Sequence, residues 1–394
     1  MSYTFDELLR RRGSRSLKWD LAKSDELPLW VADMDFAVPP AVQQRLRARF
    51  EHPVLGYPLL DDSYFSPFID WMKDRHGWEL SRESLLYAPG VMPMVHRGIE
   101  LFTNPGDPVV IQSPVYFPFF KSIELHERVV ATAPLKEVDR GDRLYFEMDF
   151  SALEEAFASG GKLFILCSPH NPVGRVWRED ELRRVAELAE AFDVVVLSDE
   201  IHGDIIFPGN RFVPFLSLGE EVQRRSLATN APSKTFNIPG LHTAYAIVPH
   251  YALRERVRTS LEKIGATMPN LFSIEGSIAA YEEGGPWLDR LIPYLRENYD
   301  RVAAFVDERL PTVRVVEQEG TYITWLDFRE VVSRSGLDPK RFAAAMRSEG
   351  KVWLSPGHVF GTEGNGFMRI NIAAPRERLI DGLERIERFV RKWV

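Results

Sequence analysis

Residues 163–202, LFILCSPHNPVGRVWREDELRRVAELAEAFDVVVLSDEIH, decide the fold class. Two short apolar runs, 163–166 and 194–197, flank a segment in which apolar residues recur every three or four positions. That spacing is typical of an amphipathic helix. The two runs are apolar at consecutive positions, as in strands that are buried on both faces of a parallel sheet. Strand, helix and strand in this order predict a βαβ unit, and therefore an α/β fold with helices on both faces of its sheet.

Two further apolar runs extend this pattern. VVIQ at 109–112 precedes SPVYFPF, and SLAT at 226–229 precedes NAPSK. Each run ends in polar or turn-forming residues, which mark the point where a strand leaves the core. We expect all four runs to be strands of one sheet.

The last hundred residues have a different pattern. A long charged helical segment at 287–310 is followed by strand-like runs at 313–316 and 321–328, a helix around Arg341 to Arg347, and a terminal amphipathic helix after Pro375. This order predicts a smaller α+β domain.

No Ser/Gly linker or repeat divides the chain. We expect an N-terminal segment, residues 1–45, that packs on the small domain, a large cofactor-binding domain at 46–284, and the small C-terminal domain at 285–394.

Composition narrows the class of protein. Of 394 residues, 49 are Lys or Arg and 57 are Asp or Glu, so the formal net charge is −8 and no basic excess favours nucleic acid as a partner. The first residues contain no apolar signal segment, no apolar run approaches the roughly 20 residues of a membrane span, and Cys167 is the single cysteine. A cytoplasmic enzyme without membrane partners is expected.

Four chemically distinct side chains follow the four expected strands. They are Tyr116, Asn171, Asp199 and Lys234. Ligands of open α/β sheets bind at the carboxyl ends of the strands, so these side chains should meet at one edge. A lysine beside a buried carboxylate and a stacking ring can form a Schiff base, as in enzymes that use pyridoxal 5′-phosphate (PLP). Asp199 would then pair with the pyridinium nitrogen, and Asn171 would bind the ring oxygen.

A glycine turn, Gly90-Val91-Met92, precedes a further periodic segment and predicts a helix N-terminus, which is a ready phosphate site. Each residue also has an ordinary interpretation when taken alone. Lys234 would be a surface lysine, Asp199 a helix cap and Tyr116 a core aromatic.

Several catalytic signatures are missing. The sequence has no GxSxG, GxxxxGK[ST], HExxH or CxxC motif, and its nine histidines are scattered, so no metal site is expected. Cys167 directly follows a strand and is interpreted as a small buried hydrophobe rather than a nucleophile.

Ten segments together resemble one family. They occur in the order seen in fold type I PLP enzymes, specifically the aminotransferase-like cystathionine β-lyases, or cysteine-S-conjugate β-lyases. The segments are LPLWVADMDFAVPPAV, GYP, APGVMP, PGDPVVIQSPVYFPFF, CSPHNPVGRVW, SDEIHGDI, APSKTFNIPGL, EGTYITWLDF, WLSPGHVFG and GFMRINIA. The resemblance runs from about Lys18 to the last helix. It implies a mostly parallel, seven-stranded PLP domain with the aspartate aminotransferase fold and a smaller C-terminal domain.

The resemblance also assigns roles. Lys234 matches the Schiff-base lysine, Asp199 the pyridinium partner, Asn171 the donor to the ring hydroxyl oxygen and Tyr116 the stacking ring. The remaining matches are Gly90, Val91 and Ser233 in the phosphate cradle, His202 beside the cofactor, Arg369 as the ligand of the substrate α-carboxylate, and Ala32 near the same carboxylate.

Tyr57 in Gly56-Tyr57-Pro58 matches a tyrosine that reaches the phosphate of the neighbouring subunit, which implies a homodimer with shared active sites. Two positions depart from the aminotransferase branch. His242 stands where those enzymes commonly have an arginine on the phosphate, and His202 stands where they commonly have tyrosine. Histidine at position 202 is usual in the lyase branch, whereas His242 fits neither branch.

The expected reaction is β-elimination from L-cystathionine or a related L-cysteine S-conjugate, which yields pyruvate, ammonia and a thiol. Cystathionine would give homocysteine, a step of methionine biosynthesis. An aminotransferase would use almost the same residues, and a PLP-binding regulatory protein without activity is a third interpretation. Trp30 and Tyr322 are expected in the wall of the substrate pocket, but the preferred thioether does not follow from the sequence.

Overall fold

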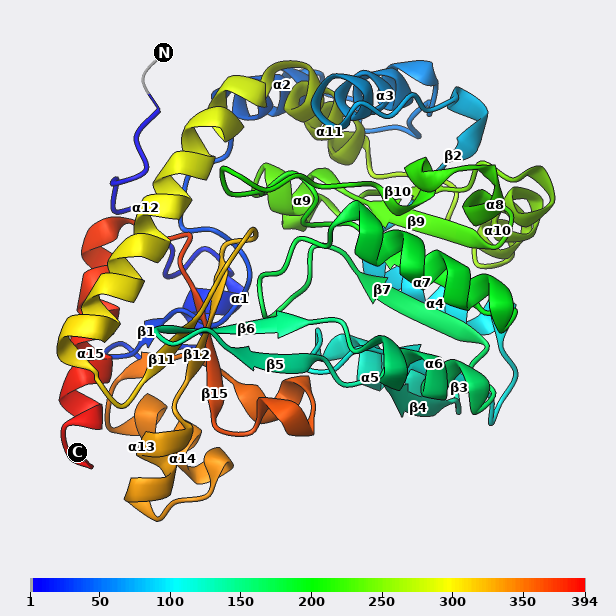
Figure 1. The fold of residues 1–394 in the computed structure, drawn as a ribbon. Coiled ribbons are helices and arrows are strands. Elements are labelled where there is room, and N and C mark those ends of the chain that lie inside the picture. The colour runs from blue at the N-terminus through cyan, green and yellow to red at the C-terminus, as the bar shows by residue number, and fades with distance from the viewer. Residues whose placement is uncertain (1–2, 394) are drawn as a thin grey trace.

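A seven-stranded sheet forms the centre of the computed structural model, which describes residues 3–393 (Figure 1). The strand order is β2-β10-β9-β8-β7-β3-β4. β10 is antiparallel to both of its neighbours, and the other adjacent pairs are parallel. The strands are β2 (Leu85–Ala88), β3 (Pro108–Ile111), β4 (Val129–Thr132), β7 (Leu163–Cys167), β8 (Val195–Asp199), β9 (Ser226–Asn230) and β10 (Ala244–Ile247). The expected mostly parallel α/β fold is confirmed.

Both faces of this sheet are covered, which explains why its strands are apolar at consecutive positions. Along β7, Leu163 and Ile165 face one hydrophobic core, whereas Phe164 and Leu166 face the other. The first core also holds residues of α4 (Val91–Phe102), α5 (Pro118–Leu125) and α10 (Tyr251–Lys263), and the second holds residues of α6 (Phe150–Ala158) and α7 (Glu179–Ala191). The expected crossover helix is α7.

A second, six-stranded sheet has the order β14-β15-β12-β11-β6-β5. Its strands are β5 (Lys136–Asp139), β6 (Arg143–Glu147), β11 (Arg314–Val316), β12 (Ile323–Asp327), β14 (Ser355–Pro356) and β15 (Phe367–Asn371). The hairpin β5–β6 comes from inside the range 46–284, yet β6 pairs in parallel with β11. The two sheets therefore do not divide the chain at one point, and the division into 1–45, 46–284 and 285–394 stays a prediction.

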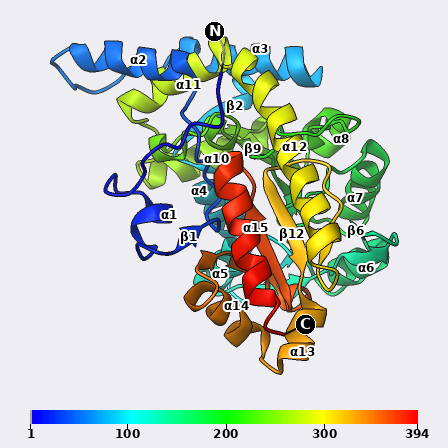
Figure 2. The same ribbon diagram turned by 90° about the vertical axis from the view of Figure 1, so that its left-hand side faces the viewer.

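Two long helices cover the second sheet. They are α12 (Gly285–Arg309) and α15 (Arg376–Val390), which lie side by side in front of β12 (Figure 2). Two shorter helices, α13 (Arg329–Ser335) and α14 (Pro339–Ser348), complete this region. No helix within residues 3–393 combines the length and the apolar character needed to cross a membrane.

The N-terminal part of the chain contacts the C-terminal region through a short strand pair. Its strand β1 (Leu27–Pro28) pairs in parallel with β13 (Val352–Trp353). The remaining helices are α1 (Leu17–Asp20), α2 (Pro40–Glu51), α3 (Asp62–His76), α8 (Glu220–Gln223), α9 (Pro232–Thr235) and α11 (Leu271–Glu283). α11 packs against α2 and α3, and these three helices lie above β9 and β10 in the view of Figure 1.

Candidate active site

A cavity of about 480 Å³ lies at the carboxyl ends of the central strands. Cys167 ends β7, Asp199 ends β8, and Lys234 lies on α9 directly after β9. The residues expected from the sequence that line the cavity are Ala32, Gly90, Val91, Tyr116, Asn171, Asp199, His202, Ser233, Lys234 and His242. The structure thus brings together residues that are up to 210 positions apart in the chain.

The Lys234 amine lies against the N-terminal segment. Its Nζ donates a hydrogen bond to the carbonyl oxygen of Ala32 at 2.6 Å, and the Tyr322 hydroxyl donates to the same oxygen at 2.9 Å. Burial, together with the positive charge of Arg369, lowers the pKa of Lys234 from 10.5 to about 8. An amine with this pKa is far more often neutral near pH 7 than an ordinary lysine, so it can serve as a nucleophile or base.

Asp199 is buried, and one of its oxygens accepts a hydrogen bond from the backbone N–H of Ile201 at 3.2 Å. Burial raises the pKa of Asp199 to about 7, against the opposing effects of that N–H and of Lys234. A cation beside the carboxylate would lower this pKa again. Asp199 is therefore suited to a cationic partner at the base of the cavity.

His202 carries no charge at neutral pH. Burial and the charges of Lys234 and Arg369 lower its pKa to about 3. The ring is 3% exposed, and its Nδ1 has no hydrogen-bond partner within residues 3–393. A buried polar atom of this kind normally has a partner, so His202 has capacity for one more hydrogen bond from a group in the cavity.

Arg369 reaches the site from the second sheet. It lies on β15, and its Nη1 donates to Asn171 Oδ1 at 3.0 Å, while Nη2 donates to the Trp30 carbonyl oxygen at 3.0 Å and to Ser355 Oγ at 3.2 Å. Burial lowers the pKa of Arg369 to about 10, so the guanidinium stays charged at neutral pH. A buried guanidinium with these neutral partners can bind a carboxylate through two parallel hydrogen bonds.

The expected helix N-terminus is present. α4 begins at Val91 after the cap residue Gly90. The first-turn N–H groups have no carbonyl partner inside the helix, and the helix dipole favours an anion there. Ser233 adds a hydroxyl, and the exposed His242, with φ of +52°, lies at the same cavity. This end of the cavity has the donors that a phosphate needs.

Tyr57 does not line the cavity. It is 93% exposed, in the segment between α2 and α3. Its expected partner is the phosphate of a neighbouring subunit, so its role stays a prediction.

Sequence reasoning gave no role to three residues around the Lys234 turn. Asp204 and Thr235 share a buried hydrogen bond of 2.7 Å, and the Asn237 side chain binds both the N–H and the carbonyl oxygen of Met34. All three stand inside the segments SDEIHGDI and APSKTFNIPGL. Their closeness in sequence to Asp199 and Lys234 was the one feature of the sequence that could have indicated a role.

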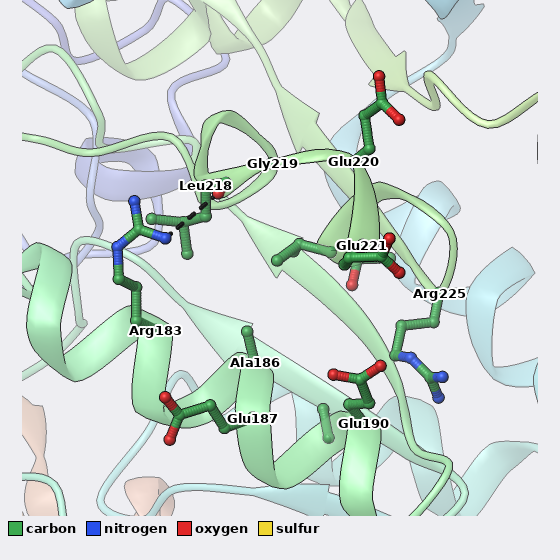
Figure 3. A pocket seen from close by; sticks show the side chains of 12 residues that line it. Arg183, Ala186, Glu187, Glu190, Leu218, Gly219, Glu220, Glu221 and Arg225 are labelled. Carbon is green, nitrogen blue, oxygen red and sulfur yellow. Dashed lines mark hydrogen bonds between the residues drawn. The ribbon is translucent and has the colours of Figure 1, made fainter.

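A second cavity, of about 320 Å³, lies between α7 and α8 (Figure 3). It includes Ser226, the first residue of β9, so it lies at the opposite end of this strand from Lys234. Arg183 donates to the Leu218 carbonyl oxygen there, and the labelled charged side chains are those of Arg183, Glu187, Glu190, Glu220, Glu221 and Arg225. Mixed surface charges at the amino end of a strand are not typical of an active site in this fold class.

The mostly parallel sheet carries an amine, a carboxylate and a set of phosphate donors at one edge. This combination is typical of the class of enzymes that bind a phosphorylated pyridine cofactor. The family model described as "Aminotransferase class I and II" matches residues 25–386. The chain belongs to this family.

Individual relatives point to the lyase branch. The chain is 39% identical over 389 residues to "Cystathionine beta-lyase PatB" of Bacillus subtilis (strain 168), with 97% of this chain and 98% of the relative covered. Among solved structures, cystalysin from Treponema denticola with PLP has a TM-score of 0.93 and 35% identity, covering 100% of both chains. The PLP-bound C-S lyase from Staphylococcus hominis has a TM-score of 0.92 and 30% identity, covering 99% of this chain and 98% of that one. The resemblance stated from the sequence is confirmed.

Proposed function

We propose that the protein is a PLP-dependent carbon–sulfur β-lyase that acts on L-cystathionine or related L-cysteine S-conjugates and forms pyruvate, ammonia and a thiol. The observation that carries this proposal is the convergence of the Lys234 amine and the buried Asp199 carboxylate on one cavity, with the Arg369 guanidinium hydrogen-bonded to Asn171 in the cavity wall. The names of the relatives support carbon–sulfur lysis as the reaction.

The residues present fit PLP. The N-terminus of α4 and Ser233 suit the phosphate, Tyr116 offers an aromatic face, and Asp199 suits a protonated ring nitrogen. When bound, PLP supplies an electron sink for the electron pair that remains on the substrate Cα after proton removal.

The protein side chains have separate tasks in this reaction. Arg369 binds the substrate α-carboxylate and so fixes the orientation of Cα. Lys234 Nζ removes the Cα proton, because burial lowers its pKa to about 8 and so makes the neutral amine far more abundant at pH 7 than in an ordinary lysine. Asp199 holds the proton on the ring nitrogen. The thiolate then leaves from Cβ, and hydrolysis of the remaining three-carbon unit gives pyruvate and ammonia.

The competing function is transamination, which needs the same lysine, aspartate and arginine. The two reactions differ after removal of the Cα proton: transamination returns a proton to the cofactor, whereas β-elimination expels the thiolate from Cβ. A PLP-binding protein without activity would bind the cofactor but would release neither pyruvate nor thiol.

Incubation of the purified protein with L-cystathionine, without an added keto acid, should release pyruvate and thiol in equal amounts. Pyruvate is measured with a coupled dehydrogenase and thiol with a chromogenic reagent. Accumulation of pyridoxamine phosphate without pyruvate would establish the aminotransferase instead. In a panel of S-substituted cysteines, cystathionine should be among the best substrates if the protein serves methionine biosynthesis. A poor rate with cystathionine alone would overturn that assignment and retain the lyase.

We also propose a homodimer in which Tyr57 completes the site of the partner subunit. Tyr57 stands in a run of exposed apolar side chains, which is unusual for a surface that faces only water; the run also includes Phe50, Val54, Leu55 and Leu59. Light scattering should give twice the chain mass of 45.2 kDa. Tyr57→Phe should remain dimeric and weaken PLP binding by about tenfold or more, because one hydrogen bond to a charged group contributes roughly 1.5–3 kcal/mol. A monomer, or unchanged PLP affinity, would contradict this role.

A further inference from the structure

A buried carboxylate lies behind the Lys234 turn. Asp204 is 5% exposed and accepts three hydrogen bonds. Trp71 Nε1 and His76 Nε2 donate to Oδ1 at 2.8 and 2.7 Å, and the Thr235 hydroxyl donates to Oδ2 at 2.7 Å. These partners hold the pKa of Asp204 below its usual value despite burial. Asp204 is therefore a fixed negative charge that links its own segment after β8 to α3 and α9.

The element that Thr235 anchors is very short. α9 has four residues and carries Ser233, Lys234 and Thr235 in one turn. A single turn has almost no stability of its own, since helix formation needs several consecutive hydrogen bonds before it becomes favourable. The position of Lys234 therefore depends on tertiary contacts of its neighbours. Thr235, which is fully buried, contributes the bond to Asp204 on one side.

The second anchor lies two residues further on. Asn237 accepts a hydrogen bond from the Met34 N–H at 2.9 Å and donates to the carbonyl oxygens of Met34 and Phe36 at 3.1 and 2.8 Å. This anchor fixes the turn to the N-terminal segment, which includes Ala32. The Thr235 anchor instead fixes the turn to Asp204, which follows Asp199, the last residue of β8, by five residues and His202 by two.

We propose that Asp204 and Thr235 are positioning residues for Lys234. Their hydrogen bond sets the position of the Lys234 turn relative to Asp199 and His202, which belong to the same segment as Asp204. This inference rests on the proposed function, because it takes Lys234 as the reactive amine. Neither Asp204 nor Thr235 lines the cavity, so both act through Lys234.

The consequence of losing this bond follows from the geometry of proton transfer. A misplacement of about 1 Å can cost on the order of 10²-fold in rate. Thr235→Val keeps the size and branching of the side chain and removes only the hydroxyl. Asp204 retains its bonds to Trp71 and His76 in this variant, so the surrounding structure is supported.

The test compares Thr235→Val, Thr235→Ser and the matched control Thr103→Val in the holoenzyme. Thr103 is also a buried threonine whose hydroxyl makes hydrogen bonds: it donates to the Ile99 carbonyl oxygen and accepts from Arg128 Nε at 2.9 Å. It follows the last residue of α4, about 18 Å from the end at Gly90. The readouts are the pH midpoint of the visible absorbance of the lysine-bound cofactor, kcat and KM for the best thioether, and the melting temperature.

Thr235→Val should shift the absorbance midpoint by about half a pH unit or more and lower kcat by about tenfold or more, with KM changed by less than about threefold. Thr235→Ser should restore both values, and Thr103→Val should change only the melting temperature.

A Thr235→Val protein with the wild-type midpoint and kcat, and a melting temperature reduced like that of Thr103→Val, would overturn the positioning role. This result is distinct from failure of the proposed function. In that case the wild-type protein would release no pyruvate from thioethers, whereas the absorbance midpoints of the Thr235 variants would still report the position of Lys234.

Discussion

Replacing Lys234 with alanine should lower β-elimination by about 10⁴-fold or more, because in the proposed reaction one amine both attaches the cofactor and moves the Cα proton. The variant should still bind PLP through the phosphate donors at α4 and the Asp199 carboxylate. It should not show the visible absorbance of a lysine-bound cofactor. Pyruvate release under single-turnover conditions, and reduction with borohydride followed by mass measurement of the peptide, check both statements.

Small primary amines provide the control for this variant. Removing the lysine side chain leaves space beside Ala32, where the Lys234 Nζ donates its hydrogen bond. Added methylamine should therefore restore part of the activity of Lys234→Ala and none of the activity of a variant whose defect is misfolding. Retention of the visible absorbance after the substitution would show that another residue is the reactive amine.

Asp199→Asn should have the second largest effect, a fall in kcat of about 10²–10³-fold, as is typical when one preorganised charge opposite a developing charge is removed. Burial raises the pKa of the Asp199 carboxyl to about 7, but a protonated ring nitrogen beside it favours the ionised form and lowers that pKa. Asparagine cannot supply the negative charge, so the ring nitrogen loses its proton and the electron sink is weaker. Steady-state kinetics with a fixed thioether measures the change.

Glu200 offers a matched control for the Asp199 substitution. It is the next residue and is also buried, but its Oε1 accepts from Ser198 Oγ at 2.9 Å and from the Phe215 N–H at 2.8 Å, and it does not line the cavity. Burial raises its pKa to about 8, so it is mostly protonated at pH 7 and glutamine resembles it closely. Glu200→Gln should keep kcat near the wild-type value. Equal losses in the two variants would contradict a specific role for Asp199.

The central sheet could be predicted from the sequence because the apolar pattern of each strand and helix lies within one continuous segment. The apolar runs at 163–166 and 194–197 and the helix between them are continuous segments, and the rule for parallel connections leaves few ways to arrange them. A second rule, that open α/β sheets bind ligands at the carboxyl ends of their strands, placed Asn171, Asp199 and Lys234 at one edge, since each stands at or just after the end of a strand. The lyase branch came from resemblance, because the chemistry of Lys234 alone is shared with transaminases.

The sequence by itself thus determined the α/β class and the candidate reactive residues at the strand ends. Only the tertiary structure decided which distant groups meet them: the bond from Arg369 to Asn171 across 198 positions, the pairing of β6 with β11, and the Asp204 carboxylate behind Thr235. The physical reason is that apolar periodicity reports which face of a segment is buried, whereas the partner of a buried polar group depends on how separate segments pack. Hydrogen bonds of that kind leave no periodic signal in the sequence.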